Sequence, residues 1–160
     1  MESGSYVAIK YTKGIGNVAL GKHAWQSSPY VTELAYPGLA VDGDKTTTLL
    51  QDGGNIYFCT HTSTGLTPQW WMVDLERTYQ VSIIVVWGRE RFGWDSRTKG
   101  LAATVGIGVT NMHQCGDQFQ GSVSENPFNF TCKSPLVGRF MKIFREDSEP
   151  VTLCEVEVYS

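Results

Sequence analysis

The stretch VSIIVVW, at residues 81–87, decides the fold of this chain. It is too apolar for an edge strand, so it predicts a strand at the centre of a sheet. Just before it, QWWMVDL at residues 69–75 alternates and places Trp71, Val73 and Leu75 on one face. Further strands are predicted at residues 103–109, 139–144 and 152–159, and no amphipathic helix of ten or more residues is visible.

Turn signals rich in glycine and aspartate separate these short strands, at residues 42–43, 52–54, 91–93 and 115–117. Many short strands with such connections predict an all-β fold, either a β-sandwich or a jelly roll. We expect the first and last segments to pair. No repeat or linker is present, so the sequence predicts one domain over residues 17–160, with residues 1–16 as an N-terminal extension of the same domain.

Length and composition exclude several classes of protein. The 160 residues are 41% hydrophobic and 12% aromatic with a net charge of −3, which fits one folded domain with a real core. The longest strongly apolar run, residues 83–87, is far shorter than the roughly 20 residues of a membrane span. A pI near 5.6 without a Lys/Arg cluster argues against nucleic acid as the partner.

Four cysteines and no C-x-x-C pair favour two disulfides in an oxidising compartment over a zinc site. The alternative is four buried thiols in a cytosolic protein. Of the three possible pairings, local sequence favours Cys115 with Cys132, because they flank a polar, loop-like stretch. It favours Cys59 with Cys154, because Cys154 lies in a terminal strand and needs a distant partner.

Two further features concern the compartment. Residues 129–131 (Asn-Phe-Thr) form an N-glycosylation sequon, and the first residues lack the apolar run of a signal peptide. The cysteines lead us to expect a mature extracellular domain.

Two clusters are candidate sites. Asp42 and Asp44 flank a glycine, which suits either a hard cation or an ordinary Asp-Gly turn. His61 and a basic loop that follows the apolar strand suit a neutral polyol such as a sugar, against the alternative of a solvated basic loop. The basic side chains are Arg89, Arg91, Arg97 and Lys99. Hydrolase and nucleotide-binding motifs are absent, so we expect no enzyme.

Five segments, in order along the chain, resemble the F-type lectins, a family of fucose-binding domains with a discoidin-like β-sandwich. They are residues 17–28 (NVALGKHAWQSS), 40–44 (AVDGD), 59–62 (CTHT), 70–75 (WWMVDL) and 153–159 (LCEVEVY). Together they cover nearly the whole chain from residue 17.

The resemblance implies a sugar site made of a histidine, an arginine some twenty-five residues later, and a second basic residue. Here these are His61, Arg89 and Arg97, with Lys99 as the alternative to Arg97. In such a site the three side chains hydrogen-bond L-fucose, and an apolar pocket receives its methyl group.

The sequence departs from the family pattern after Arg89. Arg91 stands where the family has aspartate, so we expect Asp95 to orient the basic side chains. The family's pair of adjacent cysteines is absent, and Trp94 is expected to replace it as the apolar platform.

The resemblance also implies a structural Ca²⁺ ion. Asp42 and Glu155 would give side-chain oxygens, and four residues would give main-chain oxygens: Leu39, Asp44, Phe58 and Cys154. The family's disulfides match the two pairings that the local sequence favours.

The sequence therefore predicts a secreted, non-enzymatic lectin for L-fucose or fucosylated glycans. Because single sugar sites bind weakly, we expect a homo-oligomer or a multidomain parent. One alternative is a discoidin-like adhesion module that binds protein or lipid without fucose. Another is an accessory domain of a glycosidase.

Overall fold

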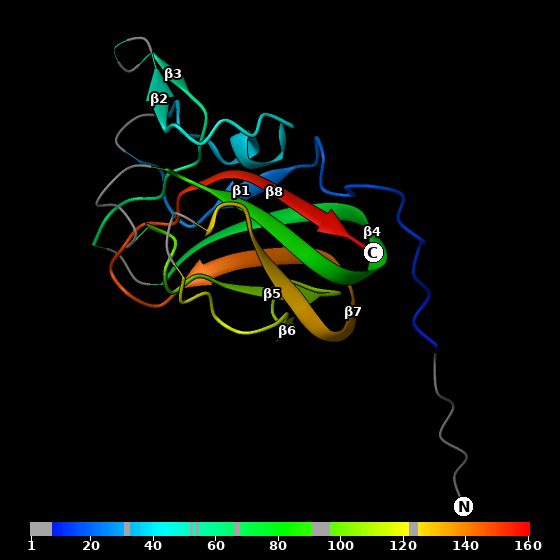
Figure 1. Cartoon of the computed structure of the whole chain (residues 1–160). Coiled ribbons are helices and arrows are strands. Elements are labelled where there is room, and N and C mark those ends of the chain that lie inside the picture. The colour runs from blue at the N-terminus through cyan, green and yellow to red at the C-terminus, as the bar shows by residue number, and fades with distance from the viewer. Residues whose placement is uncertain are drawn as a thin grey trace, which may run out of the picture.

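Two long antiparallel strands, β4 (Gln69–Gly88) and β7 (Phe128–Arg145), organise the computed structural model of the chain. Both curve through the whole molecule, as Figure 1 shows for the green and orange strands. The structure describes residues 8–30, 33–51, 53, 55–65, 68–90, 97–121 and 125–160.

Shorter strands pair along these two. The strand order is β1–β4–β7–β5–β6, and β8 also pairs with β4. The short strands of this sheet are β1 (Ala24–Gln26), β5 (Ala102–Gly106), β6 (Met112–Gln114) and β8 (Leu153–Tyr159). A separate hairpin, β2 (Leu50–Gln51) with β3 (Ile56–Tyr57), projects from one end, and the 3₁₀ helix η1 (Pro37–Val41) packs near β8.

The pairing of β4 divides it into two halves. Residues 71–73 pair with β1, whereas residues 83–88 pair with β8, and the register with β7 shifts between Asp74 and Tyr79. Glu76 adopts a left-handed φ of 67° inside this irregularity. The bend lets the apolar faces of both halves turn toward each other, so they enclose one core and form the expected β-sandwich.

The core takes alternate residues from every long strand. Trp71, Val73 and Leu75 from the first half of β4 are fully buried together with Ile84 and Val86 from its second half. Val105, Met141, Ile143, Phe130, Val156 and Val158 join the same cluster. The prediction of one face for Trp71, Val73 and Leu75 is therefore confirmed, and so is the all-β fold class.

Several strand boundaries differ from the sequence prediction. The predicted strands at residues 69–75 and 81–87 are one strand, because β7 pairs with both halves across the irregularity. The first strand does not pair with the last: β1 pairs with β4. The chain just before β1 contacts β8 instead, where the Val18 N–H donates to the Val158 carbonyl (3.0 Å).

Both disulfides form as the local sequence favoured. Cys59 bonds to Cys154, and Cys115 bonds to Cys132. Among the described residues, no helix has the length and apolar composition that crossing a bilayer requires.

Candidate functional site

A disulfide and four hydrogen bonds join the segment that carries His61 to the start of β8 and to the residues just before it. The Cys59–Cys154 disulfide joins the two segments covalently. Beyond it, Thr60 and Leu153 exchange two hydrogen bonds: the Thr60 N–H donates to the Leu153 carbonyl (2.8 Å), and the Leu153 N–H donates to the Thr60 hydroxyl (3.1 Å). Thr62 and Val151 repeat this arrangement at 3.1 and 2.9 Å. The backbone around His61 is therefore fixed before any ligand binds.

The His61 ring is buried and neutral. Its Nδ1 lies 2.6 Å from the Thr62 carbonyl, which can only accept, so Nδ1 carries the proton and Nε2 is left as an acceptor. Desolvation lowers the pKa of His61 to about 4, and the nearby positive charges of Arg97 and Arg89 act in the same direction. At neutral pH the site presents a hydrogen-bond acceptor in the neighbourhood of two guanidinium groups.

Tyr30 covers one side of His61. The two rings lie 3.9 Å apart between centroids at an interplanar angle of 35°. The backbone under them is also tied, because the His61 N–H donates to the Ala35 carbonyl (3.3 Å) and Gln26 Nε2 donates to the His61 carbonyl (3.0 Å). Sequence reasoning missed Tyr30, since nothing in the spacing of residues 29–36 shows that this loop folds onto His61.

Arg89 follows directly on β4 and is 4% exposed. Asn126 fixes the position before it: its Oδ1 accepts from the Gly88 N–H (2.8 Å), and its Nδ2 donates to the Gly88 carbonyl (2.7 Å). A Cβ at position 88 would lie 2.5 Å from the Thr98 methyl, so only glycine lets the chain beyond Arg97 approach β4 this closely. The same contact brings the segment of Arg97 next to Arg89.

Arg97 lies in the same neighbourhood. Burial lowers the pKa of its guanidinium, and the charges of Glu149 and Tyr30 oppose that shift. Glu149 Oε2 lies 3.7 Å from its Nη1. The structure therefore brings His61, Arg89, Arg97 and Tyr30 together.

Arg145, at the end of β7, anchors the backbone of this basic segment. It is 1% exposed and binds Asp147 through two hydrogen bonds, at 2.6 and 2.8 Å. Its remaining donors reach the carbonyls of Arg97 (3.2 Å) and Lys99 (2.9 Å). Sequence reasoning missed this role because Arg145 reads as the polar end of a strand.

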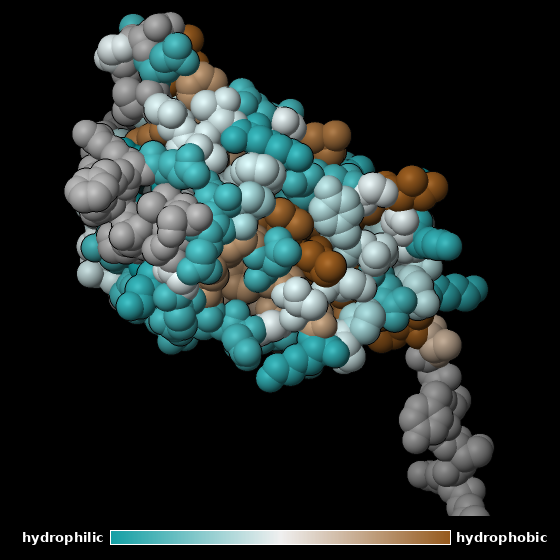
Figure 2. Space-filling model, viewed as in Figure 1, coloured by the Kyte–Doolittle hydropathy of each residue, from teal (hydrophilic) through white to brown (hydrophobic). Residues whose placement is uncertain are grey.

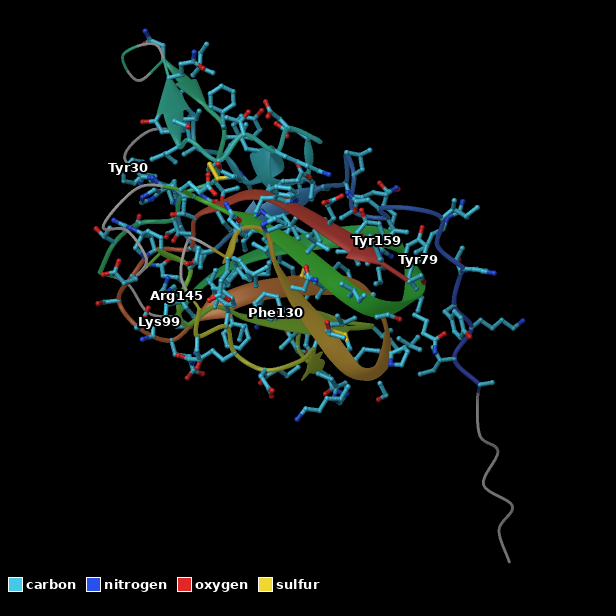
Figure 3. All side chains as sticks on the ribbon, in the orientation of Figure 1. Tyr30, Tyr79, Lys99, Phe130, Arg145 and Tyr159 are labelled. Carbon is cyan, nitrogen blue, oxygen red and sulfur yellow. A yellow bond between two sulfur atoms is a disulfide. The ribbon has the colours of Figure 1, made fainter. Side chains whose placement is uncertain are left out.

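Lys99 occupies a different place. Its side chain is exposed and lines a groove together with Gln118, Gln120 and Asp147. Figure 3 shows Lys99 beside Arg145, apart from Tyr30 along the same edge of the molecule. Trp94 and Asp95, the expected platform and orienting carboxylate, lie outside the described residues.

A largely apolar pocket of about 310 Å³ adjoins the site on the side of Tyr30. Its walls include Trp25, Pro29, Tyr30 and Tyr36, with Glu33 as the acidic group. Tyr30 therefore separates the polar His61 site from an apolar hollow.

The other end of the Cys59–Cys154 disulfide leads to a buried carboxyl. Glu155 is fully buried, its Oε2 accepts from the Gly43 N–H (2.9 Å), and its Oε1 is buried without a hydrogen-bond partner. Burial, with a smaller contribution from the adjacent Asp42, raises the pKa of Glu155 to about 8. A buried carboxyl oxygen without a donor, next to a second carboxyl, fits a cation that would take the place of the proton.

The remaining residues expected at a cation site lie on the neighbouring turns. Leu39 is in η1, and Asp44 closes an Asx-type turn in which its N–H donates to Asp42 Oδ1 (2.8 Å). Phe58 immediately precedes Cys59, and Cys154 is itself a partner in the disulfide with Cys59. No group of three or more His, Cys, Asp or Glu side chains occurs among the described residues, so such a site would rely on main-chain oxygens.

Comparison with known proteins shows the protein family to which this chain belongs. The family model described as "NedA-like, galactose-binding domain" matches residues 39–143. Fucolectin-5 of Anguilla japonica is 29% identical to this chain over 161 residues. The aligned region covers 96% of this chain and 80% of Fucolectin-5.

Two solved structures share the fold. A fucose binding module of Streptococcus pneumoniae, SpX-3, has a TM-score of 0.70 and 27% identity, covering 91% of this chain and 98% of its own. A serum fucolectin of striped bass, Morone saxatilis, has a TM-score of 0.74 and 26% identity, covering 95% of this chain and 50% of its own. The chain is thus a discoidin-like domain of the galactose-binding class. Within that class it belongs to the F-type lectin (fucolectin) family, since Fucolectin-4 of Anguilla japonica is 30% identical over 148 residues, which are 89% of this chain and 78% of that protein.

Proposed function

We propose that this protein is a lectin that binds L-fucose and fucosylated glycans through His61, Arg89 and Arg97. The observation that carries the proposal is the neutral, fixed histidine with a guanidinium group on each of two neighbouring segments. The relatives support the ligand class, since one is a fucolectin and another is a fucose binding module.

The chemistry suits adjacent hydroxyl groups. His61 Nε2 accepts a hydrogen bond from one sugar hydroxyl, while Arg89 and Arg97 donate hydrogen bonds to the oxygens beside it, including the ring oxygen. Because His61 and Arg89 are buried and the His61 ring is already held by the Thr62 carbonyl, little side-chain entropy is lost at these two residues on binding. Tyr30 supplies an apolar face for the sugar's methyl group.

The remaining predicted site residues complete this proposal. Trp94 would be the platform that stacks on the sugar, and Asp95 would orient a guanidinium. Lys99 is the alternative second basic ligand, although Arg97 is the one whose charge acts on His61. No residue is proposed to be catalytic.

We propose further that Ca²⁺ is held by Glu155 and Asp42, with main-chain oxygens of Leu39, Asp44, Phe58 and Cys154. The ion would compensate the buried carboxyl of Glu155 and tie the turn at Gly43 to β8. Its role in this proposal is structural.

The proposed setting is extracellular, where both disulfides persist and fucosylated glycoproteins are available. A single site of this size binds weakly, so we propose that several copies act together in a homo-oligomer or a multidomain parent. The striped bass fucolectin, of which this chain covers 50%, is about twice as long.

A glycan array with calorimetry on L-fucose tests the proposal. We expect fucosylated hits that His61→Ala abolishes. The matched control is His113→Ala, which removes an exposed histidine in β6. If the folded, Ca²⁺-loaded protein bound no glycan on the array, the fucose proposal would be wrong. That result would favour an adhesion module that binds protein or lipid.

A further inference from the structure

The sequon at residues 129–131 lies on the outer surface of β7. Along this strand Phe128 and Phe130 point into the core, whereas Asn129 and Thr131 are exposed. The alternation places the acceptor amide and the hydroxyl of the sequon on the same face of the sheet. It is the single Asn-x-Ser/Thr triplet of the sequence.

A half-buried apolar strip runs beside these two residues on β4. Val85 pairs directly with Asn129, and Ile83 pairs with Thr131. Directly opposed residues have Cβ atoms about 5 Å apart, so both apolar side chains lie within reach of a group attached to Asn129. Figure 2 shows hydrophobic atoms at the centre of the face on which Figure 1 places β8, β4 and β7 side by side.

The opposite side of the strip is already covered. On β8, Glu157 pairs with Val85 and is 8% exposed. It accepts from Trp87 Nε1 (3.0 Å) and from the Tyr159 hydroxyl (2.6 Å), and these aromatic side chains cover that side. The strip therefore opens toward β7, on the side where Asn129 stands.

We propose that Asn129 carries an N-linked glycan whose first sugar residues cover Val85 and Ile83. The reaction joins Asn129 Nδ2 to the anomeric carbon of an oligosaccharide on a polyprenyl pyrophosphate. The bond from that carbon to the pyrophosphate oxygen breaks, the amide nitrogen gives up one proton, and the lipid pyrophosphate leaves. The apolar face of the first sugar then packs on the strip, as sugars pack on apolar side chains.

Expression through a eukaryotic secretory pathway tests the attachment. We expect intact-mass analysis to show added mass that peptide N-glycosidase F removes, and peptide mapping to locate it at Asn129. Asn129→Gln and Thr131→Ala should lose it, while Thr131→Ser and the control Asn111→Gln should keep it. A secreted, folded protein without mass at Asn129 overturns the proposal, whatever the sugar site binds.

Trimming tests the covering role. Endoglycosidase H leaves one sugar on Asn129, so the trimmed protein should keep the Tm of the glycosylated protein. Asn129→Gln should melt about 3 °C lower, because the strip is uncovered. Equal Tm values for the trimmed protein and Asn129→Gln would overturn the covering role.

Discussion

The two ends of the Cys59–Cys154 disulfide carry two buried ionisable groups that behave in opposite ways. His61, two residues from Cys59, has its pKa lowered to about 4 and has its Nδ1 proton bound by the Thr62 carbonyl. Glu155, next to Cys154, has its pKa raised to about 8 and keeps one oxygen without a donor. Burial favours the neutral form of both.

This difference in pKa shows which kind of ligand each of the two buried groups suits. Neutral His61 can accept a hydrogen bond from a hydroxyl group through Nε2, so it needs no ion to compensate a charge. Neutral Glu155 keeps one buried carboxyl oxygen without a hydrogen-bond donor, and we propose that a cation compensates it. In our proposal the His61 site therefore binds a neutral ligand, whereas the Glu155 site binds a cation.

The largest expected effect comes from removing the bond between the two ends. Replacing Cys59 and Cys154 by alanine opens a loop of 95 residues, for which the chain-entropy model gives about 4.7 kcal/mol. The same change at Cys115 and Cys132, separated by 17 residues, should cost about 3 kcal/mol. Denaturant unfolding measures both, and sugar binding should be lost with the first pair alone. A larger cost for the second pair would contradict the comparison.

The carboxyl end predicts a pH-dependent response to Ca²⁺. Because the pKa of Glu155 rises from 4.5 to about 8 on folding, the metal-free protein should lose stability as pH rises from 4.5 through 8. The loss should be about 3 kcal/mol by pH 7. Melting curves in EDTA and in saturating Ca²⁺ check this.

The ion should therefore raise the Tm more at pH 7 than at pH 5. Glu155→Gln, which cannot ionise, should remove both the pH dependence and the response to Ca²⁺. An unchanged Tm in EDTA at both pH values would show that no ion occupies this end.

His61 predicts the opposite pH dependence of the stability of the protein. Because the pKa of His61 falls from 6.5 to about 4 on folding, its contribution is present above pH 6.5 and is lost as pH falls toward 4. The total loss should be about 3 kcal/mol. Urea unfolding of the Ca²⁺-loaded protein between pH 4 and pH 7 measures it.

The control is His61→Asn, which removes the titrating ring and should flatten this part of the profile. Affinity for L-fucose should also fall near pH 4, since protonated Nε2 no longer accepts. Binding that persists unchanged at that pH would exclude Nε2 as the acceptor.

The smallest expected effect distinguishes the two candidate basic side chains near His61, Arg97 and Lys99, by their effect on L-fucose affinity. Arg97→Ala should weaken L-fucose binding by at least about tenfold, the loss of one hydrogen bond from a charged donor. Lys99→Ala should leave the affinity within about twofold, because its exposed side chain lines another groove. Calorimetry on both variants decides between them, and a larger loss for Lys99→Ala would exchange their roles.

Much of the fold was predictable from alternation and composition. The run at residues 81–87 had to be central because both of its faces are apolar, and the cysteine positions favoured the pairing that forms. The joining of two predicted strands into β4 was not predictable, because it depends on β7 running beside both halves. The pairing of β1 with β4 also depends on a partner 45 residues or more away in the chain.

The sequence by itself determined the chemistry of this protein: a histidine beside one cysteine, a glutamate beside another, and arginines after an apolar strand. The tertiary structure alone decided how those groups behave. Neutrality of His61, the orphan oxygen of Glu155, the Tyr30 contact and the Arg145 anchor all arise from burial and from neighbours distant in the chain. Desolvation and charge act through space, so the order of residues does not reveal them until the chain has folded.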